Sequence, residues 1–181
     1  MTEPCVIVLS GLPGSGKSTT ARALAKRFDR SAHVEADRLH QMIARGAVLP
    51  DGLSKPQPGD EDEKQLRLRL EQACLMARTF VQHGFTAIVD DIVISDRLDQ
   101  VIGHLGGLDT RFVMLSPTFE SVRERWVAMD SPFADAWDWI EQERKLTDPV
   151  GLWLDTTGML VGQVADVIVE RLDEALSLIH I

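Results

Sequence analysis

The chain has 181 residues, 44% of them hydrophobic and 26% charged, a balance typical of a soluble globular protein of one domain. Its 28 acidic and 19 basic residues give a net charge of −9, which disfavours general attraction to nucleic acid or to an anionic membrane. No apolar run reaches the roughly 18 residues that a membrane-spanning helix needs. The first four residues carry no basic charge and the apolar run after them is short, so we expect no export signal and a cytoplasmic protein.

Short apolar runs alternate with helical periodicity, which is typical of an α/β domain with a mostly parallel sheet. We expect strands at 5–9, 32–35, 85–89, 111–115 and 152–154. We expect one helix to begin near Lys17 and a second to carry Leu39, Met42 and Ile43. A third is expected over 66–80, and a fourth at 98–105 with Ser95 or Asp96 as its cap. Three more are expected from Thr118, at 133–140 and at 164–176. Residues 46–62 are rich in proline, glycine and acidic residues, which predicts a mobile loop.

Cysteine, histidine and asparagine content excludes several other classes of protein. Cys5 and Cys74 are far apart and form no CxxC pair, which predicts reduced, buried thiols. The five histidines lack the spacing of a structural zinc site. The chain contains no asparagine, which excludes N-glycosylation and the Asn-Lys-x-Asp motif with which GTPases read guanine.

The sequence Gly-Leu-Pro-Gly-Ser-Gly-Lys-Ser at 11–18 matches GxxxxGK[ST] at every fixed position, between a predicted strand and a predicted helix. Its glycines allow the backbone to turn N–H groups toward phosphate oxygens, and the helix adds its positive end. We expect Lys17 to bind the β- and γ-phosphates of ATP and Ser18 to bind Mg²⁺. The other nucleotide-binding residues expected here are Gly11, Pro13, Gly14, Ser15, Gly16 and Thr19.

Asp90 and Asp91 follow a predicted strand, at the end where parallel sheets present ligand-binding residues. A carboxylate there is suited to hold Mg²⁺ or one of its waters opposite Ser18. We assign this role to Asp90, with Asp91 as the alternative, and a solvated turn is the other interpretation.

Asp37 follows the second predicted strand at the start of a helix, where a carboxylate could accept the proton of an attacking hydroxyl group. Aspartate is also a favoured helix N-cap, so capping alone is the alternative. Arg38 and His40 flank Asp37 and are interpreted as surface residues.

Together, the GxxxxGK[ST] motif, Asp37 within Val-Glu-Ala-Asp-Arg-Leu and the Ile-Val-Asp-Asp segment at 88–91 resemble the chloramphenicol phosphotransferase-like small-molecule kinases. These belong to the P-loop kinases, with gluconate, shikimate and polynucleotide 5′-hydroxyl kinases. The resemblance covers roughly residues 5–175. It implies a three-layer P-loop NTPase fold in a single domain over 1–181, with about five parallel strands, helices on both faces and a helical lid at 119–146.

The resemblance also implies site residues. It makes Asp37 the catalytic base, and it places Thr157, in Leu-Asp-Thr-Thr-Gly at 154–158, beside the adenine. Related kinases carry a lid pattern Arg-x-x-x-Arg-Gly, of which Arg125 matches the first arginine as a catalytic residue. Met129 and Asp130 replace the second arginine and the glycine, so Arg123 or Arg144 is an alternative source of the cation.

We therefore expect an ATP- and Mg²⁺-dependent phosphotransferase acting on a hydroxyl group of a small organic molecule, with an antibiotic as one candidate. A polynucleotide 5′-hydroxyl or sugar kinase, and a nucleotide-binding regulator or ATPase without an acceptor, remain open, as does the oligomeric state. The acidic segment 46–63, with Lys55 as its one basic residue, favours a neutral or cationic acceptor with an apolar body. Such a body could contact Trp139, Met42 and Leu53.

Overall fold

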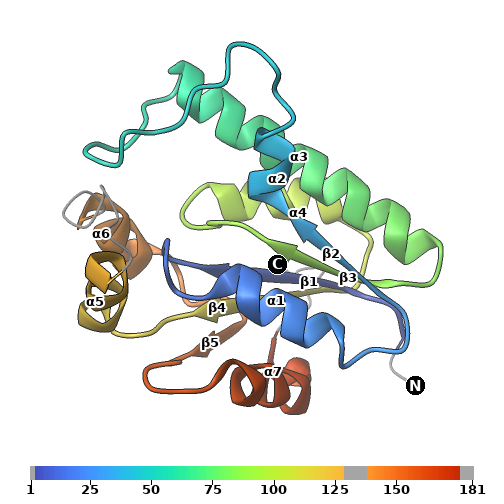
Figure 1. Ribbon diagram of the computed structural model, residues 1–181. Helices are drawn as coiled ribbons and strands as arrows, with labels where there is room; N and C mark the ends of the chain where they lie inside the picture. Colours follow the sequence, from blue (N-terminus) through green and yellow to red (C-terminus); the bar gives the residue numbers. More distant parts are fainter. Residues whose placement is uncertain (1–2, 129–137, 176–181) are drawn as a thin grey trace.

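Five parallel strands form the central sheet of the computed structural model, which describes residues 3–128 and 138–175 (Figure 1). The strands are β1 (Val6–Gly11), β2 (Ser31–Glu35), β3 (Thr86–Asp90), β4 (Thr110–Leu115) and β5 (Leu152–Leu154). Their order in the sheet is β2-β3-β1-β4-β5, and every pair is parallel. The predicted five-stranded parallel sheet is confirmed.

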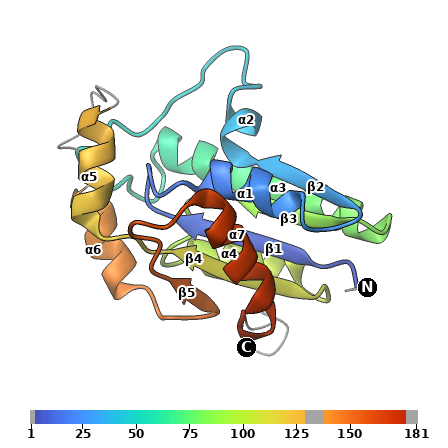
Figure 2. The same ribbon diagram turned by 60° about the horizontal axis from the view of Figure 1, so that its bottom comes forward.

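Helices cover both faces of this sheet, so the predicted three-layer arrangement is also confirmed (Figures 1 and 2). One face carries α1 (Lys17–Ala25) and α7 (Val161–Glu170), and the other carries α2 (Ala36–His40), α3 (Glu61–Gln82) and α4 (Arg97–Leu105). Beyond the carboxyl end of the sheet lie α5 (Phe119–Ala128) and α6 (Asp138–Leu146). None of the helices in the described ranges is long and apolar enough to cross a membrane.

Alternation along β1 explains why the sheet needs both helical layers. Val6 and Val8 belong to the apolar cluster formed with α3 and α4, whereas Ile7 and Leu9 belong to the cluster formed with α1 and α7. All four side chains are fully buried. Because burial of each such side chain contributes roughly 1.5–3 kcal/mol, the strand is stable only when both faces are covered.

Three predicted boundaries were wrong. The helix expected to carry Leu39, Met42 and Ile43 is the single turn α2, which ends at His40, so Met42 lies beyond it and is 74% exposed. The loop expected at 46–62 ends at Asp60, because the acidic residues after it form the first turn of α3, where the helix dipole favours them. The terminal helix expected to reach Leu176 ends at Glu170 and is followed by a short 3₁₀ turn, η1 (Leu172–Glu174); residue 176 lies outside the described residues.

The expected cap of α4 is partly correct. Asp96 occupies the N-cap position, but its side chain makes no capping hydrogen bond and pairs with Arg67 instead. Thr118, by contrast, precedes α5, and its side-chain oxygen accepts the N–H of Ser121 at 3.3 Å. The predicted helix residues 133–137 lie outside the described residues.

Both cysteine thiols are buried, as predicted, and their chemistry is testable. Burial raises the pKa of Cys5 to about 11 and that of Cys74 to about 12. At pH 8 the thiolate fraction of either group is therefore about 0.1% or less. We expect the native protein to react very slowly with a disulfide reagent that reports free thiols by absorbance, and both thiols to react at once in denaturant. Rapid modification of one thiol in the native protein would contradict this assignment.

Candidate functional site

The turn between β1 and α1 depends on glycine at two positions. Gly14 and Gly16 have φ values of 75° and 93°, in the left-handed region that side chains disfavour. A Cβ atom at Gly14 would also lie 2.5 Å from the indole nitrogen of Trp126 in α5. Within the turn, the N–H of Ser15 donates to the carbonyl of Leu12 at 3.0 Å. The turn is therefore closed on itself and packed against α5.

Lys17 folds back over this turn. Its ammonium nitrogen donates to the carbonyl oxygens of Gly11 and Leu12, at 3.0 Å each. Burial lowers the pKa of Lys17, whereas the nearby carboxylates, including that of Asp37, act in the opposite direction. The hydroxyl oxygen of Ser15 is buried without a hydrogen-bond partner among the described residues. A bound anion would compensate both groups.

Asp90 lies beside Ser18. The hydroxyl group of Ser18 donates to Asp90 Oδ2 at 2.5 Å, and His33 Nε2 lies 2.7 Å from Asp90 Oδ1. The segment after β3 is fixed by Ser10, whose hydroxyl group donates to the carbonyl of Val93 and accepts its N–H, both at 2.9 Å. These hydrogen bonds hold Asp90, which is only 4% exposed, next to the first turn of α1.

Asp37 and Asp91 share a partner that we did not predict. The guanidinium group of Arg69, from α3, donates to Asp37 Oδ1 at 2.7 Å and to Asp91 Oδ1. Glu35 holds the N-cap position of α2 and Asp37 lies inside the helix, so the capping alternative for Asp37 is wrong. The sequence did contain a signal that Arg69 is buried. Its spacing from Leu66 and Leu70 places it on the apolar face of α3.

The turn at residues 11–18, which we call the P-loop, borders a cavity of about 300 Å³ together with Asp37, Asp90 and Asp91; we call this space the P-loop cavity. Gly11 and Ser15 are not among the residues that line it; both are buried. The lining consists of Pro13, Gly14, Gly16, Lys17, Ser18, Thr19, Asp37, Asp90, Asp91 and Ile92. Most of the predicted site residues are therefore brought together around one space.

Thr157 is not among the residues that line this cavity. Its hydroxyl oxygen accepts the N–H of Thr118 at 2.9 Å, and its own N–H donates to Asp155 Oδ1 at 2.9 Å. It thereby joins the loop after β5 to the segment before α5.

The three candidate lid arginines have different surroundings. Arg125 donates to the carbonyl of Gly14 at 3.2 Å, so it reaches the P-loop backbone. Arg144 donates to Glu141 at 2.6 and 2.8 Å and to the hydroxyl oxygen of Ser116 at 2.6 Å. The guanidinium carbon of Arg123 lies 6.0 Å from the ring centre of Phe119. Residues 129 and 130, which replace the expected lid pattern, lie outside the described residues.

The expectation that both neighbours of Asp37 are surface residues holds for Arg38 and is wrong for His40. Arg38 is exposed and donates to Glu35 at 2.7 Å. His40 is 4% exposed because it lies at the buried end of α2, and neither of its ring nitrogens has a partner in the described part of the chain. Burial, aided by Arg69, lowers the pKa of His40, so its ring is neutral at pH 7.

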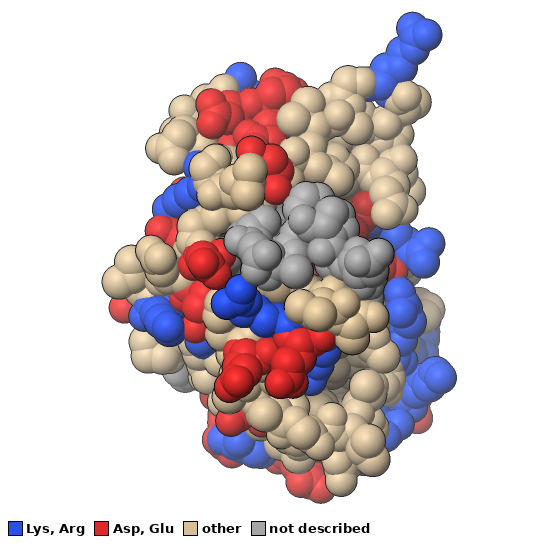
Figure 3. Space-filling model, turned by 60° about the vertical axis from the view of Figure 1, so that its left-hand side comes forward, with Lys and Arg blue, Asp and Glu red and all other residues tan. Residues whose placement is uncertain are grey.

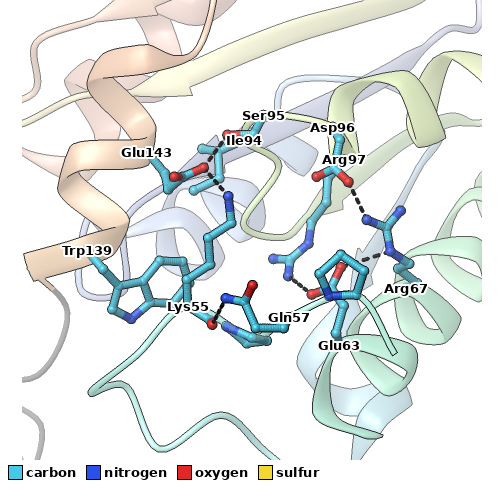
Figure 4. A pocket seen from close by; sticks show the side chains of 12 residues that line it. Lys55, Gln57, Glu63, Arg67, Ile94, Ser95, Asp96, Arg97, Trp139 and Glu143 are labelled. Carbon is cyan, nitrogen blue, oxygen red and sulfur yellow. Dashed lines mark hydrogen bonds and ion pairs between the residues drawn. The ribbon is translucent and has the colours of Figure 1, made fainter. Parts of the chain in front are cut away.

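A second cavity, of about 270 Å³, opens between the loop before α3, the start of α4 and α6, and we call it the side cavity (Figure 4). The two cavities share one segment of the chain, the loop after β3, since residues 91 and 92 line the P-loop cavity and 94–96 line the side cavity. Its lining is Lys55, Pro56, Gln57, Pro58, Glu63, Arg67, Ile94, Ser95, Asp96, Arg97, Trp139 and Glu143. Of the three residues expected to contact an apolar acceptor, Trp139 alone is in this lining; Met42 and Leu53 are about 75% exposed.

The charged groups of the side cavity are paired with one another. Figure 4 shows Lys55 reaching Glu143, at 2.6 Å, and Arg97 reaching Glu63, at 2.8 Å. Glu63 also accepts from Arg67 at 2.8 Å. The segment 46–63 is therefore less acidic toward its surroundings than its composition suggests, because Glu63 is neutralised by two arginines.

Across the described part of the face that carries α5 and α6, charges of one sign form no continuous patch. In Figure 3, acidic and basic side chains are interspersed across the described part of this face. Within the described residues, no group of three or more His, Cys, Asp or Glu side chains is arranged to hold a metal ion. A magnesium ion held by Ser18 and Asp90 would therefore take its other oxygen ligands from water or from a bound nucleotide.

Comparison with known proteins identifies similar sequences. A family model, AAA_33, described as an AAA domain, matches residues 6–128. The bifunctional enzyme CysN/CysC of Rhodopirellula baltica is 25% identical over 177 residues, which cover 94% of this chain and 26% of that protein. The chain spans about a quarter of the length of this curated relative.

Solved structures share the fold over nearly the whole chain. The Mycobacterium tuberculosis APS kinase CysC, in complex with AMPPNP and APS, has a TM-score of 0.67 at 16% identity, covering 96% of this chain and 99% of that one. A sugar kinase from Janibacter sp. HTCC2649 has a TM-score of 0.65 at 19% identity, covering 97% and 98%. The tunicamycin resistance protein of Deinococcus radiodurans has a TM-score of 0.62 at 22% identity, covering 94% and 95%. The chain has the fold of P-loop kinases.

Proposed function

The chain belongs to the AAA_33 family, and from this premise we propose that it is an ATP-dependent phosphotransferase whose acceptor is a hydroxyl group of a small organic molecule. One observation carries the proposal. Asp37, a carboxylate in α2 directly after β2, lines the same cavity as Lys17 and Ser18 of the P-loop. A phosphate-binding loop facing a carboxylate is the arrangement that phosphoryl transfer to a hydroxyl group requires.

In the proposed reaction, Lys17 and the backbone of the P-loop hold the phosphates of ATP. The oxygen of the acceptor hydroxyl forms a bond to the γ-phosphorus, while the bond from that phosphorus to the oxygen shared with the β-phosphate breaks and ADP leaves. The hydroxyl proton passes to the carboxylate of Asp37. Arg125, which lies at the P-loop backbone, supplies positive charge near the phosphates.

The hydroxyl group of Ser18 and the carboxylate of Asp90 suit a magnesium ion, which prefers oxygen ligands. When bound, Mg²⁺ would neutralise charge on the phosphate oxygens. Asp91 is bound by Arg69, and for this reason we keep Asp90 as the metal residue.

The acceptor body belongs, in this proposal, in the side cavity. Trp139 and Ile94 provide apolar surface there for an apolar body. Because Glu63 and Glu143 are already paired with cations, the charge preference rests on the acidic composition of residues 46–63. We therefore propose a neutral or cationic acceptor with an apolar body. An antibiotic, as in the chloramphenicol phosphotransferase-like kinases, is one candidate, and the likeness to the tunicamycin resistance protein is compatible with it.

The magnesium assignment predicts a ranking of two variants. Asp90→Ala should raise the Mg²⁺ concentration that gives the half-maximal rate, because it removes an anionic group beside Ser18. Asp91→Ala should raise it less. A Mg²⁺ titration of both purified variants measures this, and the reverse ranking would assign the metal to Asp91.

The base assignment predicts a selective loss of transfer. Asp37→Asn keeps the side-chain size but removes the proton acceptor, so phosphorylation of the acceptor should fall by about 10²-fold or more while ATP affinity stays near normal. Rates from single-turnover transfer and affinities from ATP titration separate the two effects. Transfer within a few-fold of the wild-type rate would exclude Asp37 as the base.

The acceptor class is tested by ATP-dependent mass gain over a panel of gluconate, shikimate, a 5′-hydroxyl oligonucleotide and neutral and cationic antibiotics. We expect efficient phosphorylation among the neutral or cationic members. Phosphorylation confined to the anionic members would favour a sugar or polynucleotide kinase instead. ADP release that no acceptor raises above the rate in water would favour an ATPase or regulator.

A further inference from the structure

Asp37 depends on another element for its position. It lies in α2, which is a single turn of five residues without a side-chain cap, and the chain after α2 forms neither helix nor strand until Glu61. The side chain of Asp37 is 69% exposed, so surrounding atoms do not hold it by packing. The hydrogen bond to Arg69 is its contact with a long, well-packed helix.

Arg69 is itself held firmly. It lies in α3, a helix of 22 residues, between side chains that face the core. Its side chain is 6% exposed and that of Asp91 is 3% exposed. Although burial disfavours its charged form, the carboxylates of Asp91 and Asp37 raise the pKa of Arg69, so the guanidinium group stays charged.

The contacts run from the interior to the cavity. Asp91 Oδ1 accepts the N–H of Ile92 at 2.7 Å, which fixes the carboxylate against the backbone after β3. One end of the guanidinium group is bound to this carboxylate, and the other end reaches Asp37 Oδ1. Asp37 Oδ2 makes no hydrogen bond within the described residues, which leaves this oxygen available to a hydroxyl proton.

Resting on the proposed function, we infer that Arg69 is a positioning residue for phosphoryl transfer: anchored by Asp91, it holds the carboxylate of Asp37 with one oxygen bound and the other directed to the acceptor. A lysine at this position would keep the charge but could not bridge both carboxylates with one planar group. The role of Arg69 is therefore exerted through Asp37, and its loss should affect the transfer step without affecting ATP binding.

A double-mutant cycle tests this inference. We expect Arg69→Met to lower the transfer rate by about 10- to 100-fold, with ATP affinity changed by less than about 3-fold. In the Asp37→Asn background the same substitution should have almost no further effect, because the group that it positions is already lost. Arg69→Lys should restore part of the rate.

A matched control comes from the same helix. Arg78 donates to the carbonyl oxygens of His104 and Gly106, far along α3 from Asp37. Arg78→Met removes a comparable number of contacts and should leave the transfer rate within about 2-fold of wild type at a temperature where both proteins are folded. Thermal unfolding of each variant establishes that temperature.

Loss of Arg69 leaves Asp91 buried and unpaired, which can prevent folding. Asp91→Asn keeps the shape and removes this charge, and it should lower the transfer rate in the wild-type background but not in the Asp37→Asn background. If the effects of Arg69→Met or Asp91→Asn multiply with that of Asp37→Asn, the inference is overturned. If Asp37→Asn alone transfers at the wild-type rate, the proposed base is wrong, which is a separate failure of the proposed function.

Discussion

Parallel pairing in one register brings the ends of β1, β2 and β3 to the same edge, and the candidate site depends on this constraint. Leu9 of β1 and Glu35 of β2 both align with Asp90 of β3, so the P-loop, Asp37 and the Asp90-Asp91 pair emerge side by side. A slip of one residue in β3 would turn Asp90 to the opposite face of the sheet. The full burial of β1 and β3 on both faces opposes such a slip.

The two adjacent aspartates serve opposite sides of the cavity. Successive side chains at the end of a strand point in different directions, so Asp90 faces Ser18 and His33 while Asp91 faces Arg69. In the proposed reaction, Asp90 would meet the nucleotide, whereas Asp91 would stabilise the side where the acceptor enters. Asp90 and Asp91 are thus adjacent in sequence but have different electrostatic surroundings.

Local sequence patterns predicted the strands, the P-loop and the carboxylates at strand ends. Apolar runs reflect the burial of a strand, and the fixed glycine spacing reflects the backbone conformation of the turn. The Arg69 pair was missed because it joins α2, α3 and the end of β3, and no local spacing contains all three. His40 was misjudged for a similar reason, since its burial depends on the helix packed against it. Met42 was predicted to lie in a helix because its spacing from Leu39 fits a helical period, but α2 ends after one turn, at His40.

The contact between Gly14 and Trp126 gives the P-loop glycine two independent reasons to be glycine. Its backbone angle is one, and the indole ring that occupies the space of a missing Cβ is the other. The nucleotide loop and α5 therefore share a van der Waals surface, joined also by Arg125 at the carbonyl of Gly14. A displacement of the loop at Gly14 would press on the indole ring or stretch the Arg125 hydrogen bond, so these two contacts couple the loop mechanically to α5.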